Sequence, residues 1–155
     1  MKTYEIELRT LSAQATAVVS TTLPAKGIGP WLSEAYTDVF SYLGRVGIAP
    51  AGPPFGRFTF HEDSVDAQAG VPVSEPIAGE GRVVASTLPG GLVAMTTYHG
   101  PYDRIESAYA ALSAWAAEHG YEPSGPHWEV YYTSPQEEPD PSRWRTDLVL
   151  PLHSS

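Results

Sequence analysis

The sequence has no cysteine, which excludes disulfide bonds, thiol catalysis and thiolate metal ligands. Its apolar runs are only a few residues long, far short of a membrane-spanning helix. Basic residues are scarce as well, because 9 Lys and Arg stand against 18 Asp and Glu, giving a formal net charge of −9. Such a charge repels phosphate backbones and attracts cations, so we expect no direct nucleic-acid binding by this domain.

The remaining composition is that of a folded domain. The chain has 155 residues, of which 42% are hydrophobic and 17% charged, and this fits one globular domain rather than a disordered chain. Residues 1–9 alternate polar and apolar side chains and include acids, which predicts a strand and not a signal peptide. We therefore expect a single cytoplasmic domain over residues 1–155, with no membrane association.

The chain repeats itself at a fixed offset of 73 residues. Six identities join the two copies without a gap: Ala35, Tyr36, Gly47, Pro50, Gly52 and Pro53 recur as Ala108, Tyr109, Gly120, Pro123, Gly125 and Pro126. Aromatic residues continue the match, since Phe55 corresponds to Trp128 and Phe58 to Tyr131. The repeat predicts two equivalent units, over about residues 15–75 and 90–153.

Each copy shows the pattern of a strand, a helix and two further strands. The first copy predicts strands at 17–22, 55–60 and 65–73, and a helix that has Pro30 in its first turn and stops at Gly47. The second predicts strands at 92–99, 128–133 and 144–152, a helix with Asp103 and Glu106 spaced as a capping box, and an exposed loop at 134–142. With an extra strand near residues 3–10, the prediction is an α+β domain with two main helices, an antiparallel sheet and pseudo-twofold symmetry.

Glu129 is the acid that stands out for chemistry. In a strand it shares a face with Tyr131, while Trp128 and Val130 point the other way, so apolar or aromatic side chains surround it on both faces. The repeat places Gly56 at the equivalent position, so the acid is present in one copy only. Two interpretations remain open: an exposed strand glutamate, or a carboxylate in an aromatic pocket that attracts cations or acts as a base.

Aromatic residues supply candidate walls for such a pocket, although most aromatic side chains in a domain of this size are core residues. Phe58 and Tyr131 carry more weight than the others because they occupy equivalent positions in the two copies. The candidate ligand-binding residues are Glu129, Tyr131, Phe58, Phe60, Trp31, Tyr98 and Trp144.

Other chemistries find no support in the sequence. The five histidines, His61, His99, His119, His127 and His153, lack metal-ligand spacing, so we expect no metal site and no cofactor. The Gly27-Ile28-Gly29 segment lacks the lysine of a phosphate-binding loop and predicts a helix-entry turn. A Gly-x-Ser-x-Gly nucleophile elbow is absent, which removes support for serine hydrolysis.

The residues resemble those of GyrI-like domains over about residues 3–152. The segments that carry the resemblance are residues 66–73, 99–102, 108–112, 119–121, 126–131 and 144–148. The resemblance implies duplicated βαββ units of the SHS2 type, with an aromatic-lined cleft between the halves that binds bulky aromatic or cationic small molecules. It also implies a site glutamate on the strand after the second helix, which here is Glu129, with Tyr131 as its companion.

The resemblance leaves three functional hypotheses. The first is a stand-alone binding protein, because the helix-turn-helix of the related transcription activators does not precede the domain in this sequence. The second is a hydrolase that opens cyclopropane-bearing antibiotics, with Glu129 as general base and Tyr131 or Tyr98 orienting the substrate. The third is an inhibitor of a topoisomerase that acts through surface acids such as Glu137 and Glu138. The sequence does not specify the oligomeric state.

Overall fold

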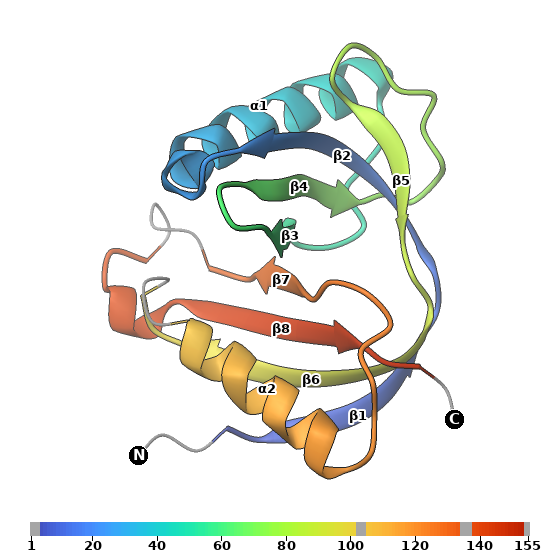
Figure 1. The fold of residues 1–155 in the computed structure, drawn as a ribbon. Coiled ribbons are helices and arrows are strands. Elements are labelled where there is room, and N and C mark those ends of the chain that lie inside the picture. Colours follow the sequence, from blue (N-terminus) through green and yellow to red (C-terminus); the bar gives the residue numbers. More distant parts are fainter. Residues whose placement is uncertain (1–3, 102–104, 134–137, 154–155) are drawn as a thin grey trace. The chain divides into compact units, whose positions relative to one another are not determined.

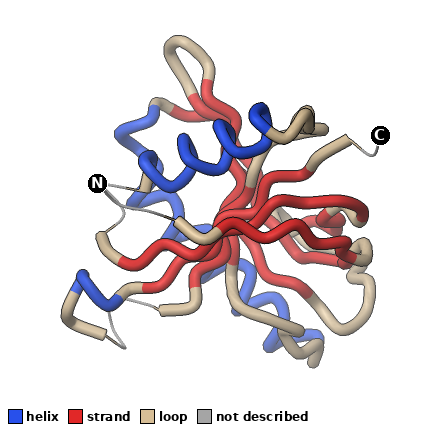
Figure 2. The backbone as a smooth tube through the Cα atoms, turned by 90° about the horizontal axis from the view of Figure 1, so that it is seen from below, coloured by secondary structure: helices blue, strands red, loops and turns tan. Residues whose placement is uncertain are grey.

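The computed structural model describes residues 4–101, 105–133 and 138–153. Within them the chain forms two compact units, one from Met1–Ser12 with Gly90–Ser155 and one from Ala13–Pro89. Each unit combines one long helix with antiparallel strands, which gives the α+β class expected from the sequence (Figures 1 and 2). No helix in the described ranges is long and apolar enough to cross a membrane.

The unit Ala13–Pro89 contains one helix packed on one face of four strands. Its elements are β2 (Gln14–Leu23), the 3-10 turn Ala25–Gly27, α1 (Ile28–Val46), β3 (Phe55–Phe60), β4 (Val65–Pro72) and β5 (Val84–Leu88). Antiparallel pairing gives the order β3-β4-β2-β5. The helix buries Ala35, Val39 and Leu43 against alternate residues of β2 and β4, because side chains two apart on a strand share a face.

The end of α1 depends on one glycine. Gly47 has φ +73°, and its N–H donates to the carbonyl of Leu43 at 2.9 Å, so the chain leaves the helix through a left-handed residue. A Cβ at Gly47 would meet no other atom, and only backbone strain opposes a side chain there. We expect Gly47→Ala to lower the free energy of unfolding by about 1 kcal/mol, measured by urea denaturation. An unchanged unfolding midpoint would contradict this account of the helix end.

The second unit has the same kinds of element. They are β1 (Ile6–Leu11), β6 (Gly91–His99), α2 (Glu106–Glu118), β7 (Trp128–Tyr131), the 3-10 turn Pro141–Arg143 and β8 (Arg145–Pro151). Antiparallel pairing gives the order β1-β6-β8-β7. The helix buries Ala108, Leu112 and Ala116 against a cluster that includes Leu148 and Leu150 of β8. In both units the strand that precedes the helix lies between an edge strand and the second strand that follows the helix.

Some local details differ from the sequence expectations. Strand β5 was not expected, because at the edge of its unit it has one paired neighbour and lacks a clear apolar alternation. Strand β7 ends at Tyr131 and is shorter than the 128–133 expected, since its pairing with β8 stops at Thr146. Asp103 of the expected capping box lies outside the described residues; within them, α2 has Ile105 at its N-cap and no side-chain cap there.

Candidate functional site

Glu129 lies in β7, and the pairing with β8 fixes the direction of its side chain. Glu129 is opposite Leu148, and Tyr131 is opposite Thr146. Residues paired directly across two strands lie on the same face of a sheet, and Leu148 belongs to the core packed under α2. Glu129 and Tyr131 therefore lie on the face that α2 covers, and the alternating pattern of the sequence predicted that they share a face.

The Glu129 carboxylate has two polar neighbours. The Tyr131 hydroxyl donates to Oε1 at 3.0 Å, and His127 Nε2 lies 3.5 Å from Oε2. The side chain of Glu129 is 13% exposed and that of His127 is 9% exposed, so both groups are largely removed from water. The Glu129 side chain is thus mostly buried, and the aromatic pocket around it stays a prediction from the sequence.

An aromatic residue of α2 completes this group. The Tyr109 ring packs against the His127 ring with 4.1 Å between the ring centroids and 38° between the planes. Tyr109 is 37% exposed, so the group reaches the surface on the side of the helix. We call Tyr109, His127, Glu129 and Tyr131 the Glu129 cluster.

The Glu129 cluster can perform two kinds of chemistry. A carboxylate with little solvent attracts a cation more strongly than one in water, and aromatic faces beside it add cation–π attraction. A carboxylate can also act as a general base, and here the Tyr131 hydroxyl and the His127 ring orient the two oxygens of Glu129.

The two other candidate residues of this unit are held by internal contacts. Tyr98 is only 1% exposed, packs in the core under α2, and donates from its hydroxyl to the carbonyl of Pro101 at 2.6 Å. Trp144 is half-buried, and its indole N–H donates to the carbonyl of Glu138 at 2.7 Å. The structure thus places Glu129 and Tyr131 together and gives Tyr98 a place in the core.

The remaining candidates, Trp31, Phe58 and Phe60, belong to the unit Ala13–Pro89. Phe58 is 7% exposed and packs in a small cluster with Val65 and Ala67, against which Trp31 of α1 also packs. Phe60 lies 6.4 Å from Phe58 between ring centroids and is 62% exposed. Phe58 and Phe60 face α1, because they pair with Ala67 and Val65 on the strand face that the helix covers.

The opposite face of β8 carries a second polar group, in which the arginine and the aspartate pair with each other. Arg145 donates to both oxygens of Asp147 at 3.2 Å, and Thr97 donates to the same carboxylate at 2.8 Å. Hydrogen bonding to Asp147 raises the pKa of Arg145, whose guanidinium also lies 4.3 Å from the centroid of the Tyr132 ring. These contacts join β6 to β8, and Arg145 is paired with Asp147 in them.

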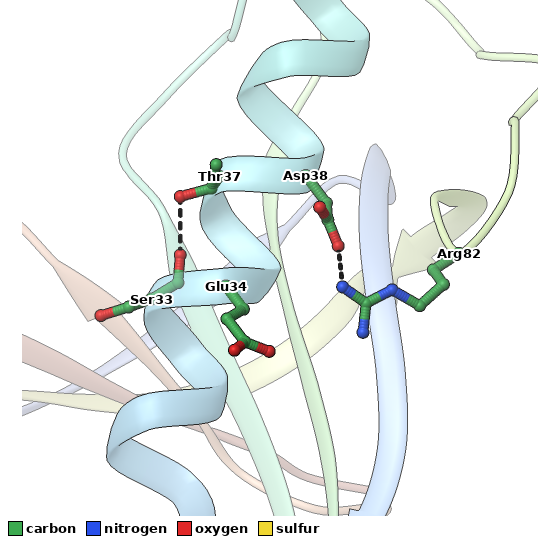
Figure 3. A pocket seen from close by; sticks show the side chains of 5 residues that line it. All are labelled: Ser33, Glu34, Thr37, Asp38 and Arg82. Carbon is green, nitrogen blue, oxygen red and sulfur yellow. Dashed lines mark hydrogen bonds and ion pairs between the residues drawn. The ribbon is translucent and has the colours of Figure 1, made fainter.

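A surface depression of about 370 Å³ lies along α1, and none of the candidate residues lines it (Figure 3). Ser33, Glu34, Thr37, Asp38 and Arg82 line it. Arg82 pairs with Asp38, and Thr37 donates to the backbone carbonyl of Ser33, so its polar groups bond to one another (Figure 3). The depression is open, and no aromatic or large apolar residue lines it, unlike a typical ligand site, so we do not assign a function to it.

Sequence reasoning missed two members of the Glu129 cluster. Tyr109 belongs to the repeat and His127 to the five histidines without metal-ligand spacing, and neither was predicted as a site residue. A signal for His127 was available, because His127, Glu129 and Tyr131 follow one another at intervals of two and therefore share a strand face.

In the described ranges, no group of three or more His, Cys, Asp or Glu residues is placed to hold a metal ion.

Comparison with known families finds one match that spans nearly the whole chain. The family model described as a GyrI-like small molecule binding domain matches residues 4–153. No curated protein sequence matches the chain.

Several solved structures are similar in fold at low sequence identity. EcmrR in a complex with DNA is 18% identical with a TM-score of 0.85, over 98% of this chain and 58% of the EcmrR chain. Its C-terminal domain alone is 17% identical with a TM-score of 0.82, over 98% of this chain and 99% of that domain. SAV2435 bound to tetraphenylphosphonium is 12% identical with a TM-score of 0.64, over 97% and 94% of the two chains. A hydrolase from Listeria innocua is 13% identical with a TM-score of 0.69, over 96% and 92%.

Proposed function

Because this chain belongs to the GyrI-like small-molecule-binding family, we propose that it binds bulky aromatic cations at the Glu129 cluster. The observation that carries the proposal is the environment of Glu129. Its carboxylate is only 13% exposed, and in the described part of the chain its ion-pair partner is a histidine, which bears a positive charge only when protonated. A carboxylate in such a setting is available to a ligand that brings its own positive charge.

The attraction expected at this site is strong enough to govern affinity. Two unit charges about 4 Å apart interact with about 4 kcal/mol at the effective dielectric constant of a partly buried site, before the cost of desolvation. Tyr109 and Tyr131 add aromatic surface beside the charge, and a cation over such a ring gains about 0.5–2 kcal/mol. A ligand with both aromatic rings and a delocalised positive charge would gain both the charge–charge and the cation–π attraction.

The comparisons support this ligand class. SAV2435, which shares the fold, was solved with tetraphenylphosphonium, an aromatic cation. EcmrR shares the fold through its C-terminal domain and was solved on DNA as a longer chain. We propose the same class of ligand here and a role in holding it without chemical change.

The duplication inferred from the sequence is part of the proposal. We propose that the two units are the two copies of the repeat, since in each copy a helix lies between the first strand and the last two. Phe58 would then be the counterpart of Tyr131, and we propose that it, with Trp31 and Phe60, contributes to ligand binding. The shared cleft remains a prediction from the sequence.

Replacing Glu129 with glutamine tests the proposal. We expect Glu129→Gln to weaken the binding of tetraphenylphosphonium by about 10- to 100-fold, because the amide keeps the shape of the side chain and removes its charge. Isothermal titration calorimetry at pH 8 gives both dissociation constants. Glu118→Gln is the matched control, since it removes the same charge from an exposed position on α2.

The outcomes distinguish binding at the Glu129 carboxylate from a general attraction of the cation to the negatively charged protein. If Glu118→Gln weakened binding as much as Glu129→Gln, the net charge of the protein would explain the affinity and the proposed site would be wrong. The absence of saturable binding by the unaltered protein would contradict the ligand class itself.

A second candidate function is favoured by the two polar neighbours of Glu129, the Tyr131 hydroxyl and the His127 ring. In a hydrolase, Glu129 would take a proton from water, and the water oxygen would bond to a strained ring carbon of the substrate. The ring carbon–carbon bond would break, and its electron pair would pass to a conjugated carbonyl of the substrate that takes up a proton. Mass spectrometry of a cyclopropane-bearing substrate after incubation would show the addition of one water molecule, and Glu129→Gln would abolish this addition. An unchanged substrate mass would exclude the reaction for that compound.

A further inference from the structure

We infer that His127 sets the charge selectivity of the Glu129 cluster, because a proton on His127 and a cationic ligand compete for the same carboxylate. The inference rests on the proposed function and goes beyond it by naming a residue that regulates the site. Its basis is the 3.5 Å separation between His127 Nε2 and Glu129 Oε2, with both side chains largely buried.

The surroundings of His127 limit which charges act on it. Glu129 lies beside its Nε2 from β7, and Tyr109 of α2 lies against its ring. Tyr131 reaches the same carboxylate from the far side through its hydroxyl. These are the hydrogen-bond, ion-pair and ring contacts that the structure records for His127 and Glu129 within the described residues, and none of them involves a lysine or arginine.

The charge on His127 decides what a ligand meets at Glu129. When the imidazole is neutral, the carboxylate presents a net negative charge to an incoming cation. When the imidazole is protonated, it forms an internal ion pair with Glu129 and repels the same cation. The two states differ by one proton, and histidine side chains ordinarily change charge between about pH 5 and 8.

The sign of the effect follows from this competition. The cation binds better when His127 is neutral, so its binding shifts the protein towards the state without that proton and releases protons. By the same linkage, acidification lowers the affinity for cations. A neutral aromatic ligand gains nothing from the negative charge, so its affinity should vary little over the same pH range. The protein would therefore hold cations at neutral or alkaline pH and release them in acid.

Tetraphenylphosphonium is a suitable probe because its positive charge does not depend on pH. We expect its dissociation constant for the unaltered protein to rise about tenfold between pH 8 and pH 5.5, and for His127→Gln to rise less than about twofold. Triphenylphosphine oxide, a neutral aromatic molecule, is the matched probe, and its affinity should change less than twofold in both proteins. Thermal melts at both pH values establish that each variant is folded.

A measurement on the unaltered protein makes the test independent of the variant. Calorimetric titration with tetraphenylphosphonium near pH 6.5, in two buffers of different ionisation enthalpy, counts the protons exchanged on binding. Release of protons is expected, because a bound cation would displace the proton that His127 shares with the Glu129 carboxylate. Uptake of protons, or no exchange between pH 5.5 and 7, would overturn the inference.

The remaining outcomes distinguish this inference from the proposed function. Cation binding that weakens in Glu129→Gln but does not vary with pH would overturn the role of His127 and leave the proposed function intact. An equal loss of affinity in acid for His127→Gln would show that another group takes up the proton. Failure of the unaltered protein to bind the cation at pH 8 would overturn both.

Discussion

Replacing Gly70 with alanine is expected to lower the free energy of unfolding by about 3 kcal/mol, because the strands leave no room for a single methyl group. A Cβ at Gly70 would overlap the backbone oxygen of Ala17 and lie 2.7 Å from Cγ1 and 2.9 Å from Cα of Val18. Gly70 pairs with Val18 on one side and Phe55 on the other, so neither neighbouring strand can move away freely. For a chain of this length the loss corresponds to a fall in melting temperature of roughly 6–12 °C.

Gly44→Ala provides the matched control for this prediction. Gly44 lies within α1 on its exposed side, and a Cβ there would meet no atom within 4 Å. The same substitution should therefore stabilise the protein by about 0.5–1 kcal/mol, since alanine is the better helix former. Chemical denaturation of the two variants beside the unaltered protein measures both effects. Equal stability of the Gly70 and Gly44 variants would mean that β2 can yield at Ala17 and Val18, contrary to the packing described.

The order of helices and strands could be predicted from the sequence because the repeat and the apolar spacing are local signals. The spacing of Ala35, Val39 and Leu43 placed α1, and Gly47 placed its end. Strand β5 could not be predicted in this way, because an edge strand with one paired neighbour needs little apolar alternation. The close approach at Gly70 depends on the neighbouring strand, which local sequence does not reveal.

The candidate site was predictable only where neighbours in sequence are also neighbours in space. Glu129 and Tyr131 are two residues apart on one strand, so their shared face followed from the sequence and their hydrogen bond agrees with it. The contact between Tyr109 and His127 joins α2 to the segment before β7, and only the packing of the helix brings them together. The aromatic candidates of the sequence include Tyr98, and the structure buries this side chain in the core under α2.

Because Tyr98 is buried in the core under α2, we expect its side chain to stabilise the fold. Tyr98→Ala should cost about 3–5 kcal/mol of unfolding free energy, as expected for removal of a fully buried aromatic side chain. Tyr98→Phe should cost about 1–2 kcal/mol, because the Pro101 carbonyl loses the hydroxyl that donates to it at 2.6 Å. Thermal and urea denaturation measure both losses.

Tyr131→Phe is the matched comparison, since it removes the same hydroxyl from a half-buried residue whose partner is the Glu129 carboxylate. We expect Tyr131→Phe to change the affinity for tetraphenylphosphonium more than the stability, and Tyr98→Phe to do the reverse. The reason is that one hydroxyl orients a charged group, while the other satisfies a backbone carbonyl at the edge of the core. If Tyr98→Phe instead weakened ligand binding about tenfold with unchanged stability, Tyr98 would belong to the binding site, and the core under α2 would have to open when the ligand binds.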